Sequence, residues 1–342
     1  MEPEVRVVDL SDRKVGSALN GVLVIDKPTG WTSHDVVAKV RTLLRVQKAG
    51  HTGTLDPSAT GVLLLCLGKA TRIAEYLVNN DKAYRAVLRL GVATDTQDAT
   101  GVVVERNAGP LPDETAIRTV MSHFVGTHRQ MPPMYSAVKV KGVPLYKSAR
   151  AGQTVTRAAR ECRVRALEII SIASTPTPEA SPGGVRPSST IDVTFDVVCS
   201  KGTYIRTLCA DIGDALGVGG HLARLERRQV GRFRIEEALS LDELARLVER
   251  EAVSTRLHSL TAALSDLPAL TLDDVAAEGV LHGIPVPTAR VVEVEGRWVG
   301  EAPVRLHAQD GRLLAIGQAP CGRDDLGRAP SPTVVKVEKV LV

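Results

Sequence analysis

Aromatic and cysteine residues are scarce in this chain. Aromatic residues make up 3% of the sequence, so each tyrosine and phenylalanine is a candidate for a specific role. The five cysteines are odd in number and scattered, at positions 66, 162, 199, 209 and 321. No pair has the Cys-x-x-Cys spacing and none clusters with histidines, so the pattern favours neither a disulfide framework nor a zinc site.

The sequence also has no long apolar run. Its first residues, Met1-Glu2-Pro3-Glu4-Val5-Arg6, have no apolar signal core, and no stretch approaches membrane-spanning length. We therefore expect a cytoplasmic protein with reduced thiols. A hydrophobic content of 44% and a length of 342 residues are typical of a globular chain with room for two domains.

An excess of charge of one sign is confined to one segment. The formal net charge is only +4, but the stretch from Arg129 to Arg165 contains nine Lys or Arg and a single acid, Glu161. Clustered positive charge is typical of a polyanion-binding surface, although a solvated face would look the same. Because the segment also holds Pro132-Pro133, we expect residues 128–165 to form a mobile extension that grips RNA.

The most informative stretch is Gly50-His51-Thr52-Gly53-Thr54-Leu55-Asp56-Pro57-Ser58-Ala59-Thr60-Gly61. Its composition predicts a loop, and the apolar run 62–67 after it predicts a buried strand. Pro57 restricts Asp56 to extended backbone geometry. A simple Asp-Pro turn remains open. A phosphate-binding P-loop fails, because no Gly-Lys-Ser/Thr follows the glycines.

This stretch resembles the catalytic motif Gly-His-Thr-Gly-x-Leu-Asp-Pro-x-Ala-Thr-Gly of the TruB-type tRNA pseudouridine-55 synthases. Three further segments are similar to motifs of that family, and the resemblance covers nearly all of residues 20–240. They are Asp26-Lys27-Pro28-Thr29-Gly30, the Gly-x-Tyr-Ile-Arg-x-Leu of residues 202–208, and the Leu-x-Arg-Arg of residues 225–228.

The resemblance implies an α+β fold. A catalytic domain over 1–266 would have a mixed, largely antiparallel sheet with flanking helices, and 267–342 would form a small β-barrel-like RNA-binding domain of the PUA type. Short runs separated by Gly and Pro, including Trp298-Val299, independently indicate short strands after about residue 267. The Pro-, Ser- and Gly-rich stretch 175–189 predicts a flexible surface loop.

Local patterns predict several elements of the catalytic part. Thr32-x-x-Asp35 fits a capping box at the start of a helix. Residues 84–90 and 191–197 alternate with a period of two, as in strands. Arg206 falls in the first turn of a helix, where a cation opposes the helix dipole, which suggests an anionic partner. The carboxylates in the loop 94–101 are expected to cap turns rather than bind a metal.

The resemblance also implies a reaction and its central residues. The enzyme would break the uracil–ribose bond, rotate the base and rejoin it through carbon, with no cofactor and no metal. Asp56 would be the nucleophile and Arg206 its counter-ion. Tyr84 would pack on the target base and is a candidate acceptor of the C5 proton. Tyr204 would orient the Asp56 carboxylate through a hydrogen bond.

Four further residues match positions around the family's bound nucleotide. His51 would take the place of the flipped base in the RNA stack, because an enzyme that acts on a stacked base must flip it out. Leu225 would form an apolar wall of the base pocket. Lys27 and Arg72 would hold phosphates, although a solvated charge remains the alternative for each.

The expected partner is the T-arm stem-loop of tRNA, bound by a monomer without an obligatory protein partner. Three other functions stay open: an RNA-binding or RNA-folding module without catalysis, a pseudouridine synthase acting on another RNA, and a nucleotide-binding enzyme that uses the Gly-rich loop. A tRNA-folding activity beside catalysis is a further hypothesis.

Overall fold

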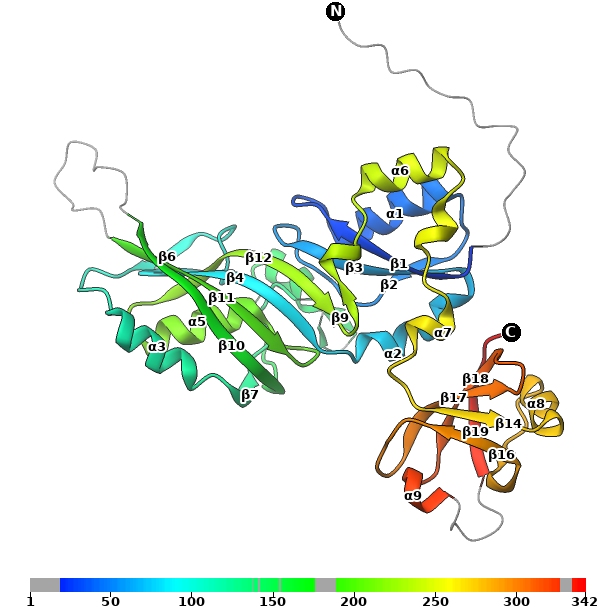
Figure 1. Ribbon diagram of the computed structural model, residues 1–342. Coiled ribbons are helices and arrows are strands. Elements are labelled where there is room, and N and C mark those ends of the chain that lie inside the picture. Colours follow the sequence, from blue (N-terminus) through cyan, green and yellow to red (C-terminus); the bar gives the residue numbers. More distant parts are fainter. Residues whose placement is uncertain (1–18, 137, 141, 154, 176–188, 327–333) are drawn as a thin grey trace, which may run out of the picture.

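The computed structural model describes residues 19–175, 189–326 and 334–342, apart from residues 137, 141 and 154. Two large sheets organise these residues (Figure 1), and two further sheets have two strands each. Almost all of the loop expected at 175–189 lies outside the described residues. No helix among the described segments is long and apolar enough to cross a membrane.

The larger sheet has nine strands, and its main path runs β1-β3-β12-β4-β11-β10-β7. β2 adds to β3 and β13 adds to β12. Every pairing is antiparallel except that of β12 with β3. The predicted mixed, largely antiparallel sheet is therefore confirmed. The strands are β1 (Gly21–Lys27), β2 (Ala49–His51), β3 (Thr60–Leu67), β4 (Lys82–Leu90), β7 (Gly126–Gln130), β10 (Arg160–Thr175), β11 (Thr190–Cys199), β12 (Gly220–Val230) and β13 (Phe233–Arg234).

Strand β4 has the alternation of buried and exposed residues that the sequence predicted for 84–90. Tyr84 and every second residue after it are buried, whereas the intervening arginines lie on the other face. Arg85 pairs with Asp196 at 2.8 Å and Arg89 with Asp192 at 2.6 Å, both across the β4–β11 pairing. Cross-strand ion pairs of this kind reinforce the register that the apolar face sets.

Helices cover each half of the larger sheet (Figure 1). The capping box predicted at Thr32 is present and begins α1 (Ser33–Leu44), which packs with α6 (Leu241–Glu249) on the β1–β3 half. On the other half, α3 (Glu114–Ser122) and α5 (Ile205–Ala215) share a core with β4 and β11. Shorter elements connect these parts: η1 (Gly68–Ile73), α2 (Ala74–Val78), β5 (Val92–Thr94), β6 (Val103–Arg106), η2 (Ile235–Glu237), η3 (Val253–Arg256) and α7 (Leu260–Ala263).

The basic segment 128–165 is anchored in the larger sheet at both ends. It leaves the sheet through β7 and returns through β10, which pair with each other. Between them lie β8 (Lys139–Val140), β9 (Val143–Pro144) and α4 (Leu145–Arg150). Leu145 is buried, so part of the expected extension is packed rather than exposed to solvent.

The second sheet has six strands in the order β15-β19-β18-β17-β14-β16. It curls into a half-barrel consistent with a PUA-like domain. Trp298-Val299, expected as a strand, lies outside the strands; the Trp298 indole instead donates to the Cys321 carbonyl at 2.8 Å. The elements are β14 (Ala269–Leu272), α8 (Asp274–Leu281), β15 (Val286–Pro287), η4 (Thr288–Arg290), β16 (Val291–Glu295), β17 (Ala302–Ala308), β18 (Leu313–Ala319), α9 (Arg323–Leu326) and β19 (Val334–Val340).

The second sheet is packed against the first rather than tethered to it. Ile316 and Leu341 belong to the same buried cluster as Val22 and Leu64 of the larger sheet. At its rim, the Tyr76 hydroxyl of α2 donates to Glu338 of β19 at 3.1 Å. Apolar burial of this kind holds two layers in a fixed relation.

One row of residues crosses four neighbouring strands. Lys27 of β1 lies opposite Gly61 of β3, Gly61 lies opposite Arg227 of β12, and Arg227 lies opposite Tyr84 of β4. At Gly61 the backbones of β3 and β12 leave no room for a side chain. Its backbone has φ +99°, and a Cβ there would meet the Arg227 carbonyl oxygen at 2.2 Å.

We therefore expect Gly61→Ala to destabilise the protein by about 3 kcal/mol or more, because it adds both a backbone strain and a backbone clash. The measurement is the free energy of unfolding in urea. Gly50→Ala is the matched control: a Cβ at Gly50 meets nothing within 4 Å. A Gly61→Ala protein as stable as the Gly50→Ala protein would contradict this prediction, because it would show that β3 and β12 can move apart at little cost in free energy.

Candidate active site

Asp56 and Arg206 form an ion pair at the end of the Gly-rich loop. Arg206 Nε lies 3.0 Å from Asp56 Oδ2 and Nη2 lies 3.5 Å from Oδ1, so the guanidinium addresses both carboxylate oxygens. The Arg206 side chain is 6% exposed and that of Asp56 is 38% exposed. The carboxylate thus stays accessible while its partner is buried. The expected counter-ion contact is present, and it explains a cation in the first turn of α5.

Opposing influences act on the Asp56 carboxyl. Burial raises its pKa, Arg206 pulls the pKa down, and Asp98 raises it again. A carboxylate that is partly removed from water needs a fixed cation nearby to remain ionised. Arg206 fits this requirement, because its buried guanidinium lies 3.0 Å from the carboxylate.

Asp98 is a second carboxylate of this cluster, for which the sequence indicated only a turn. Its Oδ1 accepts hydrogen bonds from the Thr100 amide at 2.9 Å and the hydroxyls of Thr96 and Thr100 at 2.8 and 2.6 Å. The expected turn is therefore present. The second oxygen, Oδ2, lies 3.6 Å from Arg206 Nη1, so Arg206 joins two carboxylates. The Thr-x-Asp-x-Thr pattern signals the turn, but nothing local signals its distant arginine.

Two backbone carbonyls complete the shell around Arg206. Nη1 donates to the Thr96 carbonyl at 3.3 Å and Nη2 to the Tyr135 carbonyl at 2.7 Å. Tyr135 belongs to the basic segment, so that segment directly contacts Arg206 of the ion pair.

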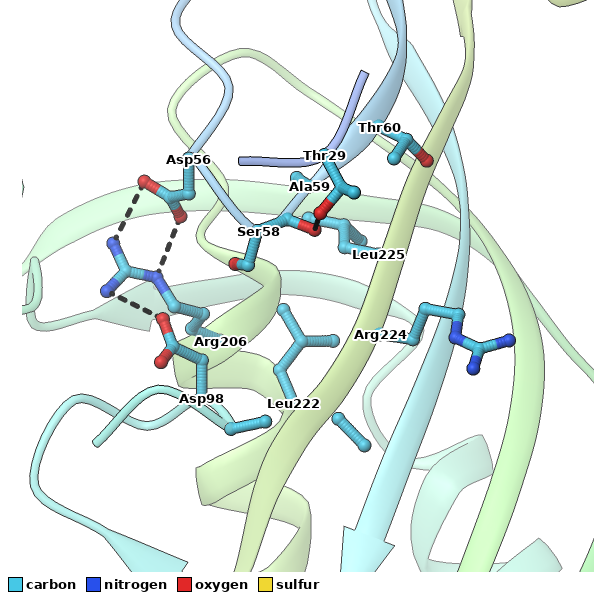
Figure 2. A pocket seen from close by; sticks show the side chains of 12 residues that line it. Thr29, Asp56, Ser58, Ala59, Thr60, Asp98, Arg206, Leu222, Arg224 and Leu225 are labelled. Carbon is cyan, nitrogen blue, oxygen red and sulfur yellow. Dashed lines mark hydrogen bonds and ion pairs between the residues drawn. The ribbon is translucent and has the colours of Figure 1, made fainter. Parts of the chain in front are cut away.

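The ion pair forms one wall of a cavity of about 370 Å³ (Figure 2). Asp56, Arg206 and Asp98 lie together on one side, with Leu222 and Leu225 nearby. The cavity is within the size range of small-ligand sites. Leu225 therefore lies where an apolar wall was expected. The lining residues are Thr29, Asp56, Ser58, Ala59, Thr60, Asp98, Ala99, Arg206, Leu222, Ala223, Arg224 and Leu225.

Tyr84 belongs to the buried cluster that also contains two residues of the cavity wall. It is 9% exposed, and the two cavity residues of its cluster are Ala59 and Leu225. Burial raises the pKa of its hydroxyl. Its contact with the target base stays a prediction.

His51 is the last residue of β2 and lies near the start of the Gly-rich loop. Its Nδ1 accepts a hydrogen bond from the Gly53 amide at 3.3 Å, which places the ring proton on Nε2 in the neutral form. Its ring lies edge-on to His34, with centroids 5.5 Å apart. Burial, and then the charge of His34, lower the pKa of His51. A neutral, half-buried ring suits stacking, and the stacking role stays a prediction.

Lys27 is placed differently from the expectation that it holds a phosphate. It is fully buried, and its ammonium donates to the carbonyls of Pro28, Trp31 and Pro57 at 2.9, 2.7 and 3.3 Å. These three acceptors occupy all three of its donors. Lys27 instead ties the Asp-Lys-Pro turn to the residue after Asp56. Burial lowers its pKa to about 8.

Two other predicted residues lie apart from the ion pair. Arg72 is exposed in η1, with its role untested. Tyr204 caps the N-terminus of α5, and its backbone amide and carbonyl both bond the side chain of buried Gln130, at 2.9 and 3.3 Å. Among the described residues, no hydrogen bond joins the Tyr204 hydroxyl to Asp56. Tyr204 therefore stands directly before the helix that bears Arg206, and its action on the Asp56 carboxylate stays a prediction.

No cluster of His, Cys, Asp and Glu suited to a metal occurs within the described ranges. The site offers the accessible carboxylate of Asp56, the buried guanidinium of Arg206 and the buried phenol of Tyr84. These groups suit nucleophilic and acid–base catalysis on a base held in the cavity.

Family models place this site in a known class. Residues 41–205 match the N-terminal domain of the TruB family pseudouridylate synthases, and residues 206–275 match the tRNA pseudouridylate synthase B C-terminal domain. A chain of a crystal structure of a Cbf5–Nop10–Gar1 complex has the same fold, with a TM-score of 0.73, 30% identity, and coverage of 95% of this chain and 85% of that chain. Fold and site together define a pseudouridine synthase, which is an isomerase.

Curated relatives make the assignment more specific. The tRNA pseudouridine synthase B of Burkholderia pseudomallei (strain 668) is 44% identical over 306 residues, which cover 88% of this chain and 94% of the relative. That of Geobacter sulfurreducens is 45% identical over 306 residues, which cover 89% and 95%. The chain belongs to the TruB family of pseudouridine synthases.

Proposed function

We propose that this enzyme converts the uridine at position 55 of the tRNA T-loop into pseudouridine, with Asp56 as the nucleophile. The observation that carries the proposal is the Asp56–Arg206 ion pair at the wall of the cavity. The relatives' printed name, tRNA pseudouridine synthase B, supports tRNA as the substrate.

The proposed reaction uses these groups in turn. The uridine leaves the RNA stack, at a cost of a few kcal/mol, and its uracil enters the cavity. Asp56 attacks, the bond between N1 and C1′ breaks, the base turns, and C5 bonds to C1′. Attack at uracil C6 and attack at ribose C1′ are two routes to this end. Tyr84 then accepts the proton that C5 must lose. Breaking and remaking a bond at one ribose needs no cofactor.

RNA would be held by the basic segment. Arg129 of β7 and Arg163 and Arg165 of β10 are exposed on paired strands. Phosphate contacts by such side chains give affinity and orientation rather than sequence selectivity. The segment also contacts the ion pair through Tyr135 and the start of α5 through Gln130. RNA bound there would therefore influence the position of Arg206.

The remaining proposals concern the whole protein. Residues 267–342 act as a second RNA-binding domain, and the enzyme works as a cytoplasmic monomer. A tRNA-folding activity would accompany catalysis through the same grip on the T-arm. An Asp56→Asn protein that fails to speed tRNA folding, where wild type does, would contradict a folding role independent of catalysis.

The function is tested by mapping pseudouridine by position in an unmodified tRNA transcript, in a minimal T-arm stem-loop, and in a transcript with cytidine at position 55. The reactions contain a chelator and no added nucleotide. We expect modification at position 55 of the first two RNAs and none in the third. Pseudouridine at other positions would point to a different target, and binding without modification would point to an RNA-binding module.

A further inference from the structure

Arg227 is a buried cation to which the proposed function gives no role. It is 3% exposed, on the central strand β12. Its Nε donates to the Val62 carbonyl at 2.7 Å and its Nη2 to the Gly53 carbonyl at 3.1 Å. None of the ion pairs among the described residues includes it. Burying an unpaired guanidinium is costly, and an apolar side chain of similar size would fill the space at lower cost. This points to a use for the charge.

The charge faces Tyr84. The two residues are direct cross-strand partners, so their side chains leave the sheet on the same face. Among the groups near Tyr84, the positive charge of its cross-strand partner Arg227 favours the phenolate. Cys199 on β11 and Asp56 on the catalytic loop oppose the phenolate.

The other groups near Arg227 give it no negative partner. They are the ammonium of Lys27 on β1, that of Lys82 on β4, and the ring of His51 on β2. Lys27 and Lys82 both donate to backbone carbonyls, Lys82 to those of Val78 and Asn80. The negative charge that would best relieve Arg227 is therefore one that forms on Tyr84.

We propose that Arg227 is a positioning residue that stabilises the Tyr84 phenolate and so allows it to take the proton from C5 of the rearranged uracil. The proposal rests on the proposed function. In this step the proton passes from C5 to the phenolate oxygen, and the C5–H electron pair enters the ring and restores the C5=C6 bond. The negative charge then leaves with Asp56 if the carboxylate was bound to C6. If it was bound to C1′, a proton added at N1 neutralises it.

The anchoring of Arg227 suits this task. Its two carbonyl acceptors belong to the catalytic loop, at Gly53, and to the strand that follows that loop, at Val62. The guanidinium of Arg227 is thus held in a fixed place relative to the loop that bears Asp56 and to its cross-strand partner Tyr84. Such fixed charges contribute most in a site that excludes water.

The test separates the late proton transfer from the earlier steps. Arg227→Met removes the charge, Arg227→Lys keeps it, and Arg228→Met is the matched control on the same strand. Release of tritium from C5-labelled T-arm RNA is measured in single turnovers between pH 6 and pH 10. The same variants are measured on RNA with 5-fluorouridine at the target, where C5 carries no proton to be removed.

We expect Arg227→Met to release tritium at least about tenfold more slowly at pH 7.5, with the rising limb of its pH profile moved up by about one unit or more. The direction follows because the phenolate is the active form, and loss of a cation makes it form at higher pH. Arg227→Lys should keep most of the wild-type profile. All three variants should rearrange the fluorinated RNA at the wild-type rate.

An unshifted profile in Arg227→Met, or equal losses on both RNAs, would overturn the proposal and leave Arg227 a structural residue. So would an Arg227→Lys protein as impaired as the methionine variant. If melting shows that Arg227→Met does not fold, Arg227→Gln replaces it, because its amide can still donate to the Val62 carbonyl. Failure of the proposed function looks different: wild type itself would rearrange neither RNA.

Discussion

Asp56→Asn is expected to abolish pseudouridine formation, with a fall in the single-turnover rate of at least about 10⁴-fold. Asparagine has nearly the same shape but provides no anionic nucleophile. It also removes the ion pair with Arg206, which then faces Asp98 alone. The measurement is tritium release from C5-labelled T-arm RNA with enzyme in excess.

RNA affinity and a control variant show whether the lost activity reflects the loss of the nucleophile. RNA affinity should change by less than about threefold, because phosphate contacts supply most of it. Asp242→Asn, at an exposed site in the first turn of α6, is the control and should retain wild-type activity. Modification that survives in Asp56→Asn would assign the nucleophile to another carboxylate.

Replacing Arg206 should have the second largest effect. We expect Arg206→Met to lower the rate at pH 7.5 by about 10³-fold or more, because the charge that stabilises the Asp56 carboxylate is lost. Arg206→Lys should restore only part of the lost rate. Its ammonium cannot contact two carboxylates and two carbonyls at once, as the planar guanidinium does. Both variants are compared in the same single-turnover assay.

The pH profile gives the sharper test of Arg206. Burial raises the pKa of Asp56 and Arg206 lowers it. The ionised carboxylate is the active form, so activity is present above this pKa and is lost as pH falls through it. Without Arg206 the pKa rises further, and the acid limb of the rate profile should move to higher pH. An acid limb unchanged in Arg206→Met would mean that the cation acts on a later step.

Local features of the fold were predictable from the sequence. The capping box at Thr32 and the alternation in β4 depend on residues a few positions apart, and both are present as expected. Trp298-Val299 has the composition of a strand, but its conformation is set by a contact of the indole with Cys321, far along the chain. Short apolar runs carry little periodicity, so tertiary contacts decide them.

The candidate site shows the same contrast between what short sequence patterns predict and what tertiary contacts decide. The resemblance named Asp56 and Arg206, and the structure brings them together. Lys27 was expected to hold a phosphate because it matches a basic position beside the family's active site, yet tertiary packing buries it completely. Asp98 could be recognised as a turn residue from its threonines, whereas its contact with Arg206 depends on chain segments that only the fold brings together.

The position of β12 has a consequence for the order in which the enzyme is assembled. β12 is synthesised late, yet it lies between β3, which follows the loop that bears Asp56, and β4, which bears Tyr84. Pairing across such long sequence separations is slow to form. A nascent chain that ends before Gly220 already contains the nucleophile, the phenol and Arg206, but the strand that joins the two half-sheets has not been made. We therefore expect the enzyme to gain its active site at one late event, the insertion of a single strand, rather than by gradual growth of the sheet from one edge.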